Sequence, residues 1–344
     1  MLEKFLVGTY TKKTSDGVYE MAIDTDKEQL TAPNLVARAD SPTYLALSAA
    51  HKLYAVDKNA AEGIGGTTAF DLTKSPAEIL NHVFSKGSSP AYVAVDEKRQ
   101  LVYEGNYHTA TVKSFAIQAD GSLALADVIT HQGAVGPAPE QTDGPHVHYT
   151  DLTPDNRLIV CDLGMDQVTI YDVSDDGKLS LVSTYQTEPG FGPRHVAFNT
   201  QKNLCYLVGE LSSEIATLKY DPTTGTLTHL QTLKTIPADW TEHNGAAAIR
   251  LTADGQFVYV SNRGFNTLAV FAVQEDGTLA LRQQISTEGD FPRDFALDAT
   301  QQFAVVVNQN TDNATLYRRN ATTGQLTLLQ KNVTVPEGVC VVFE

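Results

Sequence analysis

Eight polar residues between positions 146 and 309 carry the groups that acid–base chemistry and anion binding require. Imidazole and carboxylate groups accept or release protons, and guanidinium groups form paired hydrogen bonds with carboxylates and phosphates. All eight occur at two positions of a repeated sequence pattern, where the other repeats carry different residues. If they lie together, they form a candidate catalytic or binding site. The set comprises His146, His148, Arg194, His195, Glu210, Arg263, Arg293 and Gln309.

The elements that must hold these residues recur along the chain at intervals of roughly 50 residues. In each copy a proline or small residue precedes an apolar-alternating segment, a polar turn and a second strand-like segment, as in SPAYVAVDEKRQLVYEGN. Two more strand-like runs follow, usually joined by an Asp/Gly turn, so each unit predicts four short strands. The six copies are spaced by 48, 55, 48, 51 and 48 residues, at Pro42, Pro90, Pro145, Pro193, Asn244 and Pro292.

The two ends of the chain supply a seventh unit in two pieces. Residues 336–344 match only the first strand of a unit, and residues 1–40 match the other three. Four strands per repeat are typical of a β-propeller blade, and a ring closed by both termini leaves no open sheet edge. We therefore predict an all-β, seven-bladed β-propeller of four-stranded antiparallel blades, forming a single domain over residues 1–344. The alternative, two β-sandwiches, does not require prolines in phase across the copies.

The repeats also predict where the variable positions lie. One position follows the recurring proline, at the start of the innermost strand, and the other ends the second strand. Because neighbouring strands are antiparallel, both positions fall on one face of the ring, close to the central channel. We therefore expect the eight polar residues to gather at one mouth of that channel.

The sequence gives no support for a metal or a cofactor. The chain has no paired-cysteine or His-x-x-x-His pattern, no glycine-rich nucleotide loop and no GxSxG motif. We predict that the site works without either.

The amino-acid composition limits the classes of binding partner and the cellular compartment that we expect for this chain. Lys and Arg number 25 against 41 Asp and Glu, and the net charge of −16 disfavours nucleic acid and anionic membranes. No apolar run approaches the length of a membrane helix, and no secretory signal is visible at the start. Cys161, Cys205 and Cys340 lie in apolar, strand-like contexts and are expected to be buried thiols of a reducing cytoplasm. The oligomeric state stays open.

Several of the repeated segments, taken together, resemble the seven-bladed β-propeller lactonase family. They are GPHVHYTDLTPDNRLIVCDLG, GPRHVAFNTQKNLCYLVGELSS, DGQFVYVSNRGFNTLAVF and FPRDFALDATQQFAVVVNQ. The family includes propeller-type 6-phosphogluconolactonase and carboxy-muconate cyclase, and the resemblance spans nearly the whole chain. Its motifs correspond to His148, to Arg194 and His195, to Glu210 and to Arg263. In the sixth blade the family motif departs at Asp294, where another polar or an aromatic residue is commoner.

The resemblance implies hydrolysis of a small anionic sugar lactone. The expected substrate is 6-phospho-D-glucono-1,5-lactone, converted to 6-phosphogluconate in the pentose phosphate pathway. Either His148 or Glu210 could deprotonate the attacking water, and Arg194 could stabilise the oxyanion. Arginine also binds phosphate through paired hydrogen bonds. The expected substrate-binding residues are His146, His195, Arg263, Arg293 and Gln309.

Two other functions stay open at this stage. A carboxy-muconate-type lactonising enzyme would use the same imidazole, carboxylate and guanidinium groups for proton transfer during ring closure. A non-catalytic propeller scaffold of the WD-repeat kind is the third possibility, but the chain has one Trp and no Trp-Asp pair. That residue, Trp240, could either stack on a sugar face or pack at the edge of the core.

Overall fold

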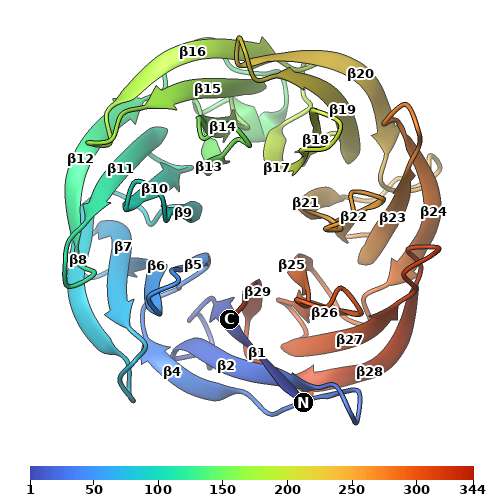
Figure 1. Cartoon of the computed structure of the whole chain (residues 1–344), viewed down its shortest axis with the longest axis horizontal. Helices are drawn as coiled ribbons and strands as arrows, with labels where there is room; N and C mark the ends of the chain where they lie inside the picture. Colours follow the sequence, from blue (N-terminus) through green and yellow to red (C-terminus); the bar gives the residue numbers. More distant parts are fainter.

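The computed structural model describes all 344 residues and contains seven sheets set radially around a channel (Figure 1). The predicted fold class is confirmed, because each sheet is an antiparallel blade and the ring is closed by strands from both ends of the chain. The innermost strands around the channel are β5, β9, β13, β17, β21, β25 and β29. No helix in the fold has the length and apolar composition that crossing a membrane requires.

The strands of each blade follow one another from the channel outward. The first two blades contain β5 (Leu45–Leu47), β6 (Lys52–Asn59), β7 (Ile64–Asp71) and β8 (Glu78–Lys86), then β9 (Tyr92–Asp96), β10 (Leu101–Asn106), β11 (Thr111–Ile117) and β12 (Leu123–Thr130). The next two contain β13 (Val147–Leu152), β14 (Leu158–Asp162), β15 (Gln167–Val173) and β16 (Leu179–Gln186), then β17 (Pro193–Asn199), β18 (Leu204–Gly209), β19 (Glu214–Asp221) and β20 (Thr226–Lys234). Two more contain β21 (Gly245–Leu251), β22 (Phe257–Arg263), β23 (Thr267–Val273) and β24 (Leu279–Ser286), then β25 (Pro292–Leu297), β26 (Phe303–Asn308), β27 (Asn313–Arg319) and β28 (Leu326–Thr334). A single 3-10 turn, η1 (Pro139–Gln141), lies in the loop before β13.

The remaining blade joins the two ends of the chain. Its innermost strand is β29 (Gly338–Phe343), which pairs with β1 (Leu2–Thr9), and β1 pairs with β2 (Gly17–Asp24). Two short strands, β3 (Gln29–Leu30) and β4 (Asn34–Arg38), share the outer position beside β2. The C-terminal segment thus supplies the first strand of this blade and the N-terminal segment supplies the rest, as the split repeat predicts.

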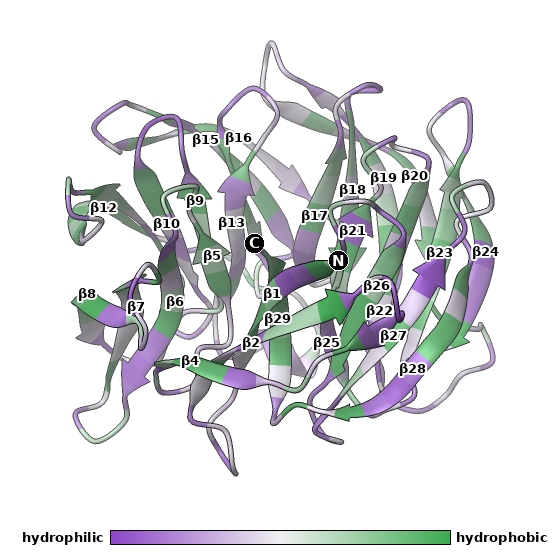
Figure 2. Ribbon diagram, turned by 60° about the horizontal axis from the view of Figure 1, so that its bottom comes forward, coloured by the Kyte–Doolittle hydropathy of each residue, from purple (hydrophilic) through white to green (hydrophobic).

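The core lies between neighbouring blades, because each sheet buries apolar residues on both of its faces. Phe5 and Val7 of β1, for example, pack in one cluster with Val305 and Val307 of the adjacent blade. The outermost strands are half exposed. In β28, for example, hydrophobic and hydrophilic segments alternate along the strand (Figure 2). Sheet-to-sheet packing of this kind holds the innermost strands in place around the channel.

Tyrosines of the second strands tie neighbouring blades together. The hydroxyl of Tyr54 donates to the carbonyl of Gly121 at 3.1 Å, and that of Tyr206 donates to Gly277 at 3.1 Å. Both glycines lie in hairpin turns of the next blade at positive φ, +92° and +86°, which side chains rarely adopt. The Asp/Gly turns of the repeat therefore serve the ring as well as their own hairpins.

Candidate functional site

A cavity of about 370 Å³ opens at one mouth of the channel, on the face that the repeats predict. Four of the eight predicted residues line it directly, namely His148, Glu210, Arg263 and Arg293. They come from four consecutive blades, and the rest of the lining belongs to the three blades on the other side of the channel. Those other lining residues are Tyr10, Lys12, Thr43, Lys58, Ser88, Ser89, Pro90, Ala91, Tyr107 and His108.

Three functional side chains owe their direction to irregular strand pairing. The registers of β13 with β14, β17 with β18 and β25 with β26 all shift near the start of the inner strand. The residue left without a partner is His148 in the first pair, Arg194 in the second and Arg293 in the third. A β-bulge inserts one residue and turns its side chain away from the regular alternation. Each bulge therefore aims one imidazole or guanidinium group at the channel.

Glu210 is the centre of an ion cluster. Its Oε2 lies 2.7 Å from Nε of Arg194 and 2.9 Å from a terminal nitrogen of Arg263, which comes from the next blade. The N–H of Arg194 Nε is not aligned with the carboxylate oxygen, so this contact is electrostatic. The two arginine side chains are almost completely buried, whereas that of Glu210 is 21% exposed. The carboxylate therefore keeps a face that a ligand or a water molecule can reach.

The pKa values in the cluster follow from burial and from these charges. Burial alone would raise the pKa of Glu210, but Arg263 and Arg194 outweigh it and hold that pKa well below its usual range. Burial and the charge of Arg263 lower the pKa of Arg194 to about 9. At neutral pH Glu210 is therefore ionised and the two arginines are protonated. Because its pKa is so low, the Glu210 carboxylate is a weak proton acceptor.

Two histidines lie against this cluster as neutral imidazoles. Burial and the charge of Arg194 hold the pKa values of both His148 and His195 well below the usual range. A terminal nitrogen of Arg194 donates to Nε2 of His195 at 3.3 Å, so this nitrogen carries no proton. The rings of His148 and His195 are 5.2 Å apart, and Nδ1 of His148 is buried without any hydrogen-bond partner. His148 itself lies beside the cavity as a neutral imidazole.

Arg293 forms the far side of the cavity together with Tyr10. Its guanidinium lies 5.8 Å from the centre of the Tyr10 ring, and Nζ of Lys12 lies 4.3 Å from the same ring. The positive charge of Arg293 lowers the pKa of the Tyr10 hydroxyl. The Tyr10 hydroxyl is thereby a stronger hydrogen-bond donor than an ordinary phenol, at a position where an anionic group would sit.

Some of the predicted residues do not reach the cavity. His146 stacks on the ring of Tyr107 at 4.0 Å, and its two ring nitrogens are held by the carbonyl of Tyr107 and by Asp143. Gln309 lies outside the lining and binds the Phe291 carbonyl through its backbone. His195 and Arg194 lie beneath the lining, where they contact His148 and Glu210.

Several residues that were not among the eight predicted ones also line the cavity. Tyr10, Thr43, Lys58 and Tyr107 occupy the same two variable positions of the repeat as the residues that were singled out. The variable positions of the repeat therefore predict these four residues as well. Trp240 packs edge-on against Phe265 with ring centres 4.8 Å apart and does not line the cavity.

The residues present suggest no metal site. No group of three or more His, Cys, Asp or Glu side chains is arranged so that it could hold an ion. Two of the side chains of this kind that line the cavity, His148 and Glu210, lie beside arginines. The lining holds two arginines and two lysines against one carboxylate, so the cavity has an excess of positive charge, which suits an anionic ligand.

Comparison with known proteins agrees with this geometry. Residues 4–343 match the family described as "Lactonase, 7-bladed beta-propeller". The 6-phosphogluconolactonase of Bacillus subtilis strain 168 is 41% identical over 343 residues, which cover 98% of this chain and 97% of that protein. A crystal structure of a Lactobacillus plantarum protein shares 60% identity and has a TM-score of 0.97 over the whole of both chains. The periplasmic gluconolactonase PpgL of Pseudomonas aeruginosa is 31% identical, with a TM-score of 0.91 over 100% of this chain and 99% of that one.

Proposed function

Because the chain belongs to the seven-bladed β-propeller lactonase family, we propose that its channel mouth hydrolyses 6-phospho-D-glucono-1,5-lactone to 6-phosphogluconate. The observation that carries the proposal is the cluster of Glu210, Arg194 and Arg263 beside the neutral imidazole of His148. It combines a proton acceptor, cationic donors for an oxyanion and a cavity with a positive excess charge. A lactone hydrolase that acts on an anionic sugar needs all three.

His148 is the general base in this proposal. Its imidazole is neutral and lines the cavity, so it can accept a hydrogen bond from the attacking water. Glu210 is the weaker candidate, because two arginines hold its pKa far below that of a useful base. The arginine charges that keep His148 neutral are offset when a dianionic phosphate binds. The bound substrate therefore makes His148 more basic at the moment when the proton must move.

The arginines of the cluster stabilise the oxyanion. Water attack on the lactone carbonyl moves a pair of electrons onto the carbonyl oxygen, while the proton of the water passes to His148. The guanidinium groups of Arg194 and Arg263 are already fixed by Glu210, so they need little reorganisation to receive this charge. Collapse of the intermediate breaks the ring C–O bond, and the departing ring oxygen takes the proton back from His148.

The outer part of the cavity provides a place for the phosphate. Arg293, Lys12 and Lys58 lie on its lining, and Ser88 and Ser89 add hydroxyl groups. Lys58 is 3.8 Å from Asp40, a loose pair that leaves its ammonium group available. Because PpgL is named a gluconolactonase, an unphosphorylated lactone is the second candidate, and these cations are what favours the phosphorylated one here.

The test is hydrolysis of two freshly prepared lactones by the purified chain, with and without a chelator. We expect faster loss of 6-phosphogluconolactone than in buffer, a smaller effect on D-glucono-1,5-lactone, and no effect of the chelator. His148→Asn should lower the rate by about 10²- to 10⁴-fold. His146→Asn is the matched control, because His146 lies outside the lining, and it should keep the rate within a few-fold. If neither lactone is hydrolysed faster than in buffer, the proposal fails.

The same proposal places the enzyme in the cytoplasm, within the pentose phosphate pathway. Cys161, Cys205 and Cys340 are buried free thiols, and none of them forms a disulfide. Burial raises the pKa of each thiol, so they remain protonated at neutral pH. Free thiols of this kind fit a reducing compartment.

A further inference from the structure

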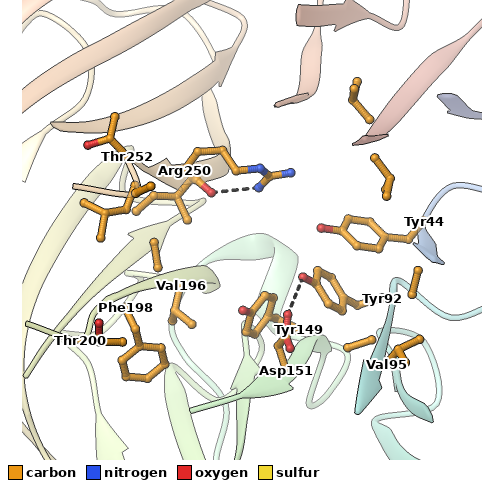
Figure 3. A pocket seen from close by; sticks show the side chains of 18 of the residues that line it. Tyr44, Tyr92, Val95, Tyr149, Asp151, Val196, Phe198, Thr200, Arg250 and Thr252 are labelled. Atoms are coloured by element: carbon orange, nitrogen blue, oxygen red, sulfur yellow. Dashed lines mark hydrogen bonds between the residues drawn. The ribbon is translucent and has the colours of Figure 1, made fainter. Parts of the chain in front are cut away.

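A second cavity, of about 610 Å³, occupies the other end of the channel (Figure 3). It is lined by the later parts of the innermost strands and by the turns that follow them, such as Thr200 after β17 and Thr252 after β21. The mouth with Glu210 is lined instead by residues at or before the start of the innermost strands, such as His148, and at or after the end of the second strands, such as Arg263. The two cavities therefore lie at opposite ends of one axis, and the volume of the second falls within the usual range for ligand pockets, about 300–1,000 Å³.

A layer of aromatic rings separates the two ends. His195 lies 5.9, 5.2 and 5.3 Å from the ring centres of Tyr44, Tyr92 and Tyr149, three residues that line the second cavity. Tyr92 is itself only 4.0 Å from Tyr44 and 4.5 Å from Tyr149, so the three tyrosines form a continuous row. One face of this layer carries His148 and Arg194, and the other carries the polar groups of the second cavity. A ligand at one end does not touch the groups at the other.

Hydrogen-bond acceptors and donors face each other across the second cavity. Asp151 stands on one wall, where its Oδ2 accepts from the Tyr92 hydroxyl at 3.3 Å and its Oδ1 from the Leu152 amide at 2.7 Å. From another wall Arg250 extends toward the hydroxyl of Tyr44 (Figure 3). Its side chain is 27% exposed, and two of its N–H groups are held by Asp294 and the Ile249 carbonyl. The other N–H groups of this guanidinium remain free to bind a ligand.

The charges in this cavity differ from those at the mouth with Glu210. Asp294 is almost fully buried and lies 2.7 Å from Arg250, so the guanidinium is already neutralised. Asp151 adds a carboxylate and no cation, so the site has no positive excess to attract an anion. A neutral ligand that both donates and accepts hydrogen bonds, and that has an apolar face to lie on the tyrosine row, matches all these features.

We propose that the second cavity binds a neutral, polyhydroxylated ring compound, a monosaccharide without phosphate or carboxylate. Its hydroxyl groups donate to Asp151 and accept from Arg250 and from the hydroxyls of Tyr44 and Tyr149, while its C–H face packs on Tyr92 and Tyr149. This inference is independent of the proposed lactone hydrolysis, because the binding step involves none of the residues at the mouth with Glu210. The site adds a second class of ligand at the opposite end of the channel.

The experiment is a binding titration of the whole chain with D-glucose, followed by calorimetry and by saturation-transfer NMR, with D-glucuronate, which keeps the ring and carries a carboxylate, as the charged comparison. We expect saturable glucose binding below about 50 mM, and at least tenfold weaker binding of glucuronate, because its carboxylate meets Asp151. Asp151→Asn should weaken glucose binding about tenfold or more, since hydrogen bonds to a charged acceptor are the stronger ones. Glucose binding that does not saturate, or that is equally tight in Asp151→Asn, would overturn the proposal.

A second variant distinguishes loss of glucose binding from loss of folding. Tyr149→Phe removes only a hydroxyl group and keeps the ring that packs on His195, and it should also weaken glucose binding while leaving the melting temperature close to that of the wild type. If Tyr149→Phe is well folded and binds glucose like the wild type, the assigned orientation is wrong. Lactone hydrolysis by Asp151→Asn should stay at the wild-type rate, and that assay does not depend on glucose binding. Failure of this site and failure of the proposed catalysis are thus separate results.

Discussion

Replacing Glu210 by glutamine tests whether the ion cluster holds the mouth together. The substitution keeps the shape of the side chain and removes the one negative charge that lies between Arg194 and Arg263. Breaking a buried ion pair by neutralising one partner costs about 3–5 kcal/mol. Because the Glu210 side chain is 21% exposed and water can enter, we expect the lower end, about 3 kcal/mol.

This free energy corresponds to a measurable change in the melting temperature. Unfolding entropy is about 2.1 cal/mol/K per residue, which gives roughly 0.7 kcal/mol/K for this chain. A loss of about 3 kcal/mol therefore lowers the melting temperature by about 4 °C at neutral pH. The measurement is calorimetry of wild type and Glu210→Gln side by side. Glu214→Gln is the matched control, since Glu214 pairs with Lys234 at 3.0 Å on the surface, and an exposed pair contributes about 0–1 kcal/mol.

The pH dependence of the melting temperature tests the sign of the contribution that Glu210 makes to stability. The folded-state pKa of Glu210 is depressed, so its contribution to stability is complete above the ordinary glutamate value of 4.5 and is lost as the pH falls through the folded value. The difference in melting temperature between wild type and Glu210→Gln should therefore be constant from pH 8 to pH 5, and should shrink below pH 4.5. A difference no larger than that of Glu214→Gln, or one that grows as the pH falls, would refute the role of this cluster.

Three other predictions follow from the same structure. The kcat/KM of the free enzyme should stay flat as the pH falls from 8 to 6.5, because the pKa of His148 lies below its ordinary value of 6.5; an acid limb at or above that pH contradicts the assignment. Lys58→Ala should raise KM for the phosphorylated lactone about tenfold and leave that for gluconolactone unchanged, whereas equal effects on both substrates would exclude a phosphate contact. A thiol reagent should not react with Cys161, Cys205 or Cys340 in the native protein and should modify all three in denaturant; rapid labelling of the native chain would contradict their burial.

The fold was predictable because each of its determinants is local and repeated. Prolines in phase, Asp/Gly turns and alternating apolar residues recur in copy after copy, and the split of the last blade is visible in what each terminus lacks. The broken outer strand of that blade was not predicted. Residues 29–38 pair with β2 in two separate pieces, β3 and β4, and Pro33, which cannot donate a ladder hydrogen bond, lies in the gap between them.

The positions of the site residues in the repeat were predictable, but the directions of their side chains were not. Simple alternation places the side chains of His146 and His148 on the same face of a strand, because the residues lie two positions apart, so it cannot choose which of them reaches the channel. That choice depends on the bulge at His148 and on the stacking of His146 against Tyr107 from the neighbouring blade. Asp294 is a similar case, because it follows Arg293 directly but pairs with Arg250 at the other end of the channel. Contacts between blades decide these directions, and the sequence of one blade does not encode them.

The bulges explain how a repeated fold can hold an asymmetric site. In β13, β17 and β25 one residue near the start of the innermost strand has no partner, and regular pairing resumes at the next residue. The apolar residues further along each strand therefore keep their register with the second strand, whatever side chain the bulge carries. His148, Arg194 and Arg293 can then differ from blade to blade without any change in how the blades pack. The ring supplies equivalent positions around the channel, and the residues placed there determine which end binds an anion and which end does not.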